Sequence, residues 1–203
     1  MSERIQPKKT LTDHLRASTK GIVHPMVVFL AKLGVTPNAL TMLGLLMHVP
    51  VAWALVNGRW RLASVLGIFS VMDVLDGSLA RYLNHGETSK FGAFLDSTSD
   101  RIAEVLIFGG MTWWFASQTN PTLAVVSLLA LAGSVLVSYT RARAEALGFE
   151  CKNGLFSRVE RYLTLFIFGM MNRPDLCVII LAVGTWFTVA QRIYTVWRQA
   201  RTA

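Results

Sequence analysis

Four aspartates lie inside stretches of this sequence that are otherwise apolar enough for a lipid bilayer: Asp73, Asp76, Asp96 and Asp100. On an insertion scale, one Asp at the centre of a membrane helix costs about 2.5–3.5 kcal/mol, so four would cost roughly 10–14 kcal/mol if the values simply added. A chain carries such a cost only where something offsets it, and bound cations offset clustered carboxylates most directly. The aspartates therefore predict a metal site among membrane helices, and an enzyme built around it.

The composition and the apolar segments predict an all-α polytopic membrane protein. Of the 203 residues, 53% are hydrophobic and 16% are charged, whereas a soluble domain has about a quarter charged. With ~20 residues for each span, we expect six transmembrane helices, at about 40–56, 62–83, 92–116, 122–144, 160–171 and 176–197.

A different pattern precedes these spans. Residues 10–34 mix apolar and basic side chains, which is typical of an amphipathic helix lying in the membrane interface, and Pro25 is expected to bend it. The sequence thus predicts a juxtamembrane segment over residues 1–35 and a six-helix membrane domain over residues 36–203.

The net charge of +8 follows membrane topology rather than nucleic-acid binding. Lys and Arg cluster at the ends of the apolar segments, the pattern of topology and anionic lipid contact. With the N-terminus inside, sixteen basic residues fall in cytoplasmic segments, and only Arg59, Arg61 and Arg173 fall outside. The positive-inside rule therefore predicts a multi-pass protein of the cytoplasmic membrane, with its N-terminus and aspartates facing the cytoplasm.

The spacing of the aspartates predicts a cage. Asp73 and Asp76 are three residues apart, and Asp96 and Asp100 are four apart, so each pair lies on one helix face. A short link makes the two spans antiparallel neighbours whose faces can meet, which gives four oxygen ligands for hard divalent cations. Gly77 continues the first face and leaves room for a bulky ligand group.

Two other interpretations of the acids remain open on spacing alone. Arg81 and Arg101 could neutralise them in buried ion pairs, although two cations do not balance four anions. The acids could also form the proton or ion pathway of an ion-coupled membrane transporter.

The aspartates also belong to a longer motif, which resembles the signature of the CDP-alcohol phosphotransferase family, also called CDP-alcohol phosphatidyltransferases. Every fixed position of that signature is present: Asp73, Asp76, Gly77, Ala80, Arg81, Gly92, Asp96 and Asp100. One departure is that ten residues, rather than eight, separate Arg81 from Gly92. The stretch Thr36–Thr41 is also similar to the family, and Ser138–Ala146 resembles the phosphatidylinositol-phosphate synthases within it.

The resemblance implies a reaction and roles for these residues. The family transfers a substituted phosphate from a CDP-linked lipid, here CDP-diacylglycerol, to an alcohol and releases CMP. It implies two divalent cations, Mg²⁺ or Mn²⁺, and a homodimer in the lipid membrane. The implied metal ligands are Asp73, Asp76, Asp96 and Asp100, with Asp100 also the general base; the implied CDP-lipid contacts are Asp73, Asp76, Gly77, Ala80 and Arg81.

The acceptor is predicted from three arginines at the cytoplasmic ends of the last three spans: Arg141, Arg161 and Arg192. Guanidinium groups bind phosphate through a bidentate fork, and the related enzymes are thought to hold the acceptor's phosphate at matching positions. We therefore expect inositol phosphate as acceptor and phosphatidylinositol phosphate as product. The alternatives are phosphatidylglycerophosphate synthesis from glycerol phosphate, or arginines that serve only membrane topology.

Overall fold

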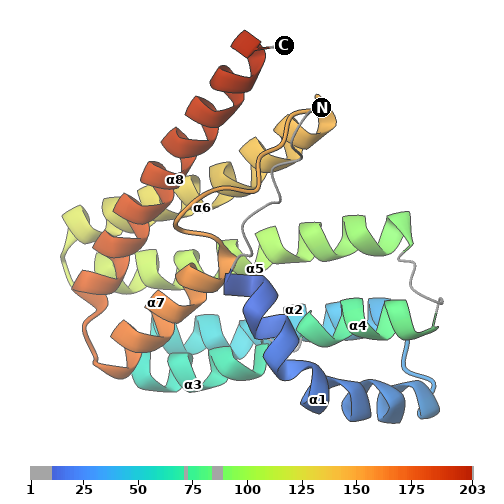
Figure 1. The fold of residues 1–203 in the computed structure, drawn as a ribbon. Coiled ribbons are helices and arrows are strands. Elements are labelled where there is room, and N and C mark those ends of the chain that lie inside the picture. The colour runs from blue at the N-terminus through green and yellow to red at the C-terminus, as the bar shows by residue number, and fades with distance from the viewer. Residues whose placement is uncertain (1–10, 71–72, 84–88, 203) are drawn as a thin grey trace.

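The computed structural model describes residues 11–70, 73–83 and 89–202, and every element in these ranges is an α-helix (Figure 1). The side chains of residues 11–20, 22, 69, 70, 73, 74 and 202, and thus of Asp73, are outside the description. The predictions for residues 1–10, for positions 71 and 72 of the second span and for the link at 84–88 therefore lie outside the described residues. Within them, the predicted all-α class is confirmed.

Eight helices follow one another along the described chain: α1 (Leu11–Lys32), α2 (Pro37–Val56), α3 (Trp60–Ser70), α4 (Asp73–Leu83), α5 (Lys90–Ser117), α6 (Pro121–Ala146), α7 (Arg158–Met170) and α8 (Pro174–Thr202). They match the predicted segments to within a few residues, except that the expected second span is divided between α3 and α4. Pro25 lies inside α1, and the helix continues on both sides of it.

Several helix ends follow directly from the local sequence. Gly34 ends the turn after α1 with a φ of +71°, a conformation that glycine adopts without strain. Thr36 then caps α2 by accepting a hydrogen bond from the Ala39 amide, and Pro37 fits the first helical turn because it lacks an amide proton. Asn120 and Pro121 start α6 in the same way.

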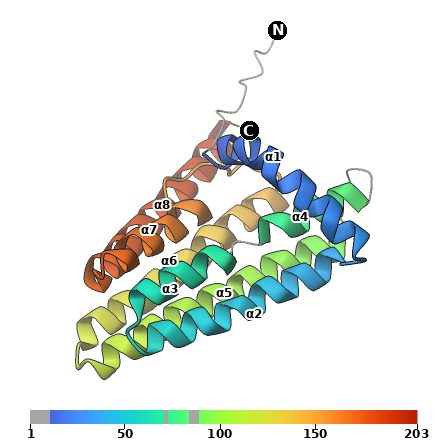
Figure 2. The same cartoon turned by 90° about the horizontal axis from the view of Figure 1, so that it is seen from below.

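Six of the helices form a closed bundle (Figures 1 and 2). Following the contacts around it, α2 packs on α5, α5 on α6, α6 on α8, α8 on α7, α7 on α3, and α3 on α2. Helix α4 packs against α2 and α1 beside this ring. The ring brings the start of α7 close to the middle of α5, although the two are far apart in the sequence.

Within the described ranges, three helices are long and apolar enough to cross a membrane, by length and composition: Pro37–Val56, Pro121–Ala146 and Pro174–Arg201. These are the first, fourth and sixth predicted spans. They also expose large apolar side chains, such as Trp53, Val125 and Val183, of which 51%, 55% and 67% is accessible. Apolar side chains directed outward are expected where the surrounding medium is lipid, so the fold is that of a membrane protein.

The main apolar core lies between the six helices of the ring, at the end distant from the aspartates. Leu55, Trp60, Met111, Val178 and Leu181 are fully buried there. A smaller cluster joins α1 to α2 and α4 through Val27, Leu40, Leu75 and Leu79. The bundle is therefore closed by apolar packing at one end, which leaves polar side chains at the other.

Two adjacent glycines on α5 give a matched test of this packing. A methyl group on Gly110 would lie 3.0 Å from the Ala52 carbonyl oxygen and 3.1 Å from Leu55 Cβ, whereas one on Gly109 meets nothing within 4 Å. We expect Gly110→Ala to destabilise the protein by about 1–3 kcal/mol because α2 must move away. Gly109→Ala should be neutral or slightly stabilising, since alanine favours helix.

The measurement is the midpoint of thermal unfolding in detergent micelles for both variants. Equal midpoints for Gly110→Ala and Gly109→Ala would contradict the close approach of α2 and α5.

Candidate active site

Three acids lie at four-residue intervals on α5: Asp96, Asp100 and Glu104. A spacing of four residues places each acid about one turn above the previous one on the same helix face. The face turns inward, because the side chains of Asp100 and Glu104 are only 13% and 5% exposed. Helix α5 thus carries a row of carboxylates into the bundle.

Asp76 of α4 is a fourth described acid and is also buried, with 6% of the residue exposed. The Thr41 hydroxyl of α2 donates a hydrogen bond of 2.5 Å to Asp76 Oδ2, and the Gly77 amide donates to Oδ1. Both carboxylate oxygens therefore have a donor, which offsets part of the cost of burial. The contact joins the first turns of α2 and α4.

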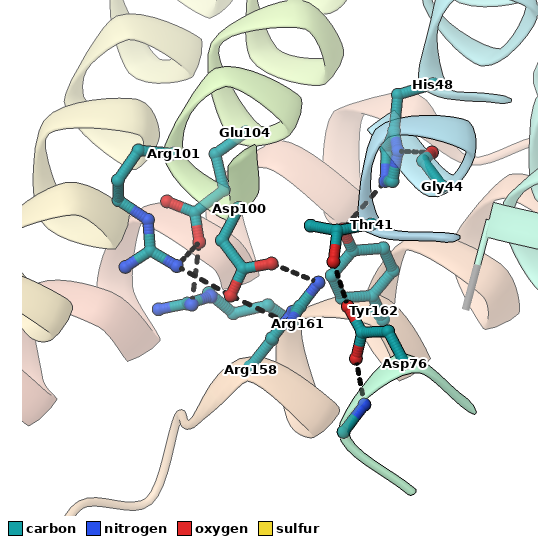
Figure 3. A network of polar contacts seen from close by, with 11 residues as sticks. Thr41, Gly44, His48, Asp76, Asp100, Arg101, Glu104, Arg158, Arg161 and Tyr162 are labelled. Carbon is teal, nitrogen blue, oxygen red and sulfur yellow. Dashed lines mark hydrogen bonds and ion pairs between the residues drawn. The ribbon is translucent and has the colours of Figure 1, made fainter. Parts of the chain in front are cut away.

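Arginines from α7 face the acids of α5 (Figure 3). Arg158 binds Asp100 through its two terminal guanidinium nitrogens, with Nη1 2.8 Å from Oδ2 and Nη2 2.6 Å from Oδ1. Arg101 Nη2 lies 3.5 Å from the same carboxylate. One turn further along, Arg161 Nη2 donates to Glu104 Oε1 at 2.8 Å. Two arginines three residues apart on α7 thus match two acids four residues apart on α5.

A small cavity lies beside Asp100, between α2, α5 and the start of α7. Thr41, His48, Ser99, Asp100 and Arg158 contribute to its lining. The His48 ring is held at both nitrogens, by the Gly44 carbonyl oxygen at 2.8 Å and by the Tyr162 hydroxyl at 3.0 Å. His48 therefore joins α2 to α7 beside the cavity that Asp100 helps to line.

The three predicted acceptor arginines differ in their surroundings. Arg161 and Arg192 are buried, with 6% and 4% exposed, whereas Arg141 is exposed and pairs with Glu145 at 2.8 Å. Arg192 lies within electrostatic range of both others. The three side chains thus lie in one region, but only two of them are inside the bundle.

Arg192 also holds the segment between α6 and α7. It donates from Nε to the Asn153 carbonyl oxygen at 3.0 Å, and from Nη1 to the Val137 carbonyl oxygen. Thr188 and Thr195 of the same helix face bond to Phe156 and Asn153. This ladder of contacts on α8 fixes the segment that leads into α7, and therefore the position of Arg158.

The predicted lipid-nucleotide residues of α4 leave open space, as their small size suggested. A methyl group on Gly77 would meet only the end of the Arg81 side chain, at 3.5 Å. Ala80 is buried. Arg81 is exposed and donates a hydrogen bond to Ser78 Oγ at 3.3 Å. Gly77 therefore has open space beside it among the described residues, whereas Ala80 is packed.

The donor set suits a hard divalent cation, because every candidate ligand is a carboxylate oxygen. Among the side chains that the structure describes, no group of three His, Cys, Asp or Glu is close enough to hold a metal ion. The side chain of Asp73 lies outside that set. Asp76, Asp96 and Asp100 are the described residues able to contribute ligands.

Three functional candidates were missed by sequence reasoning: Thr41, Glu104 and Arg158. Glu104 continues the four-residue spacing of Asp96 and Asp100, so the extended pattern could have identified it. Arg158 is one of the sixteen basic residues that the sequence assigns to cytoplasmic segments. Its contact with Asp100 forms because α7 lies close to α5 in the folded bundle. Nothing in the spacing of Thr41 indicated a bond to an acid 35 residues away.

Comparison with known proteins gives one family. A family model described as CDP-alcohol phosphatidyltransferase matches residues 34–197. The phosphatidylinositol phosphate synthase of Corynebacterium glutamicum is 37% identical over 190 residues, which are 89% of this chain and 86% of the relative.

Solved structures agree. The phosphatidylinositol phosphate synthase (PgsA1) of Mycobacterium tuberculosis with CDP-DAG bound aligns with a TM-score of 0.80 and 32% identity, over 87% of this chain and 94% of that chain. The same protein in complex with manganese and citrate aligns with a TM-score of 0.80 and 32% identity, over 86% and 88% of the two chains. Since the family model spans most of the sequence and a relative that covers 89% of this chain is 37% identical, this chain is a member of the CDP-alcohol phosphatidyltransferase family of enzymes.

Proposed function

We propose that this protein transfers the phosphatidyl group of CDP-diacylglycerol to a hydroxyl of inositol phosphate, forming phosphatidylinositol phosphate and CMP. The observation that carries the proposal is the arrangement of buried acids from α4 and α5 opposite the arginines of α7. The acids suit a metal-bridged pyrophosphate, and the arginines suit a phosphorylated acceptor. The names of the relatives support this choice of donor and acceptor.

Asp73, Asp76, Asp96 and Asp100 would bind two divalent cations, Mg²⁺ or Mn²⁺. When bound, these cations would neutralise the negative charge of the pyrophosphate. The fit rests on the all-carboxylate donor set and on the inward direction of Asp76 and Asp100. A neighbouring structure of the family contains manganese. Gly77, Ala80 and Arg81 provide the surface for the nucleotide next to these ligands.

The protein's own groups then account for the transfer. Asp100 accepts the proton of the acceptor hydroxyl as that oxygen bonds to the phosphorus bearing diacylglycerol. The bond from this phosphorus to the CMP oxygen breaks, and CMP leaves with the electron pair. Arg158 orients the Asp100 carboxylate through its two contacts. Arg161, with Arg141 and Arg192, holds the acceptor's phosphate so that its hydroxyl lies within reach.

The proposed membrane arrangement follows from the same reaction. Six transmembrane helices, α3 with α4 forming one of them, cross the cytoplasmic membrane, with residues 1–35 as a separate interfacial segment. The N-terminus and the active site face the cytoplasm, where a charged, water-soluble acceptor meets the lipid headgroup. The protein forms a homodimer, as the resemblance to the family implies.

The direct test is release of CMP by purified protein given CDP-diacylglycerol, Mg²⁺ or Mn²⁺, and one acceptor at a time. Inositol phosphate should support turnover, and glycerol phosphate should not. Turnover with glycerol phosphate alone would establish the other acceptor. Solute flux in vesicles without any CMP release would establish a transporter.

Asp100→Asn tests the general base. The amide keeps the size of the side chain but cannot accept the proton, so we expect CMP release to fall by about 10²–10⁴-fold. Binding of CDP-diacylglycerol, measured by the shift in unfolding temperature, should be largely retained. Activity close to that of the parent protein would exclude Asp100 as the base.

Asp76→Asn tests the metal site. We expect Mn²⁺ binding, followed by the loss of free-ion signal in electron paramagnetic resonance, to weaken at least about tenfold because a charged ligand is removed. Chelation should abolish CMP release by the parent protein, and added Mg²⁺ or Mn²⁺ should restore it. Unchanged Mn²⁺ binding by the variant would contradict the assignment.

Arg161→Lys tests the acceptor site while keeping a positive charge beside the buried Glu104. Lysine lacks the planar fork, so we expect the KM for inositol phosphate to rise about tenfold, with the KM for CDP-diacylglycerol nearly unchanged. Arg143→Lys, at an exposed position that contacts neither candidate site, is the matched control. Equal changes in both KM values would show that Arg161 does not select the acceptor.

A further inference from the structure

We propose that Glu104 is a positioning residue for acceptor binding, because its carboxylate holds the guanidinium of Arg161 in the orientation that receives a phosphate. The inference rests on the proposed function, in which Arg161 binds the phosphate of the acceptor. Glu104 lies outside the family motif that the sequence contains, which ends at Asp100, and it follows that aspartate by one helix turn.

The contacts of Glu104 are those of a buried, charged anchor. The residue is 4% exposed, and its Oε1 lies 2.8 Å from Arg161 Nη2 and 3.3 Å from Arg101 Nη2. A carboxylate at this depth is tolerated only with a partner of opposite charge. Of its two arginine partners, Arg161 is the nearer and the one that joins α5 to α7, across 57 residues of sequence.

The contacts of Arg161 show which of its donors remain for a ligand. Nη2 is engaged by Glu104, and Nη1 lies 3.4 Å from the Ser134 carbonyl oxygen of α6. A guanidinium has five N–H donors in one plane, so these two contacts fix its orientation and use two of the five donors. Arg161, Glu104, Ser134 and Tyr162 also line a second small cavity, whose other walls are apolar side chains of α5, α7 and α8.

Arg192 provides a comparison within the same site. Two neutral backbone carbonyl oxygens hold its guanidinium, and none of its hydrogen-bond partners among the described residues is an acid. The guanidinium of Arg161 is held by a full negative charge, and a hydrogen bond of this charged type is about twice as strong as a neutral one. Loss of the Glu104 charge should therefore disturb Arg161 without a comparable effect on Arg192.

The second carboxylate oxygen of Glu104, on the side of the cavity, is consistent with a residue that acts through Arg161 and takes no part in the transfer itself. Glu104 Oε2 is buried and has no hydrogen-bond partner among the described residues, and neither does Ser134 Oγ on the same cavity. Polar atoms of this kind accept or donate to water or to a ligand hydroxyl. In this small cavity a water molecule would satisfy both atoms.

The test is a double-mutant cycle between Glu104→Gln and Arg161→Lys. Glutamine keeps the shape of the side chain and removes its charge, so we expect the KM for inositol phosphate to rise about tenfold. The same change in the Arg161→Lys background should alter this KM by less than about twofold, because Glu104 acts through the guanidinium. The KM for CDP-diacylglycerol and the Mn²⁺ dependence should stay within about twofold in every variant.

Two further variants separate positioning from a structural role. Glu104→Asp keeps the charge and should recover most of the acceptor affinity that Glu104→Gln loses. Asp175→Asn, which removes the charge of an exposed ion pair with Arg173 at the opposite end of α7, should leave both KM values unchanged. Thermal midpoints in detergent are recorded for all variants.

Additive changes in the acceptor KM, or equal changes in both KM values, would overturn the proposal. If the parent protein uses glycerol phosphate instead of inositol phosphate, the same cycle is measured with glycerol phosphate. The acceptor assignment then fails, while the role of Glu104 is still decided by the cycle. If Glu104→Gln unfolds, the cycle is measured with Glu104→Asp instead. An unaltered acceptor KM in Glu104→Asp, together with a change in Arg161→Lys/Glu104→Asp that equals the sum of the single changes, would overturn the proposal and leave only a structural ion pair.

Discussion

The compensation of buried charge between α5 and α7 is the interaction on which the rest of the structure depends. Asp100 and Glu104 enter the bundle on one face of α5, and Arg158 and Arg161 approach them from α7. Removing one member of a buried ion pair is costly, typically about 3–5 kcal/mol, because an uncompensated charge remains. The position of α7 is thereby coupled to the acids, and the acceptor arginine is coupled to the candidate base.

The division of the bundle into an apolar half and a polar half makes this arrangement possible. Apolar packing around Trp60, Met111 and Leu181 closes the helices at one end, so the polar end does not need to close itself. Thr41 and His48 of α2 then contact Asp76 of α4 and Tyr162 of α7. Stability and chemistry are thus supplied by different lengths of the same helices, and a cavity can persist beside Asp100.

Local sequence patterns were sufficient for the helices and for the acids of the motif. The apolar segments predicted the helices closely, because helix ends such as Thr36–Pro37 and Asn120–Pro121 are encoded by capping residues. The spacing of Asp96 and Asp100 predicted their common face. The pairing of Arg158 with Asp100 could not be predicted, because it depends on the ring closing between α3, α7 and α8 rather than on any local pattern. Arg141 is grouped with Arg161 and Arg192 by its position at a cytoplasmic helix end and by the resemblance to related enzymes, and burial distinguishes it from them.

The account depends most directly on where a divalent cation binds. Crystals of the protein grown with Mn²⁺ and CDP-diacylglycerol would locate the metal by anomalous scattering. We expect two manganese peaks between α4 and α5, within coordination distance of Asp76 and Asp100, with the pyrophosphate bridging them. Manganese bound elsewhere, with the Asp76 and Asp100 carboxylates without metal contacts, would contradict the central claim that acids from these two helices form one metal site.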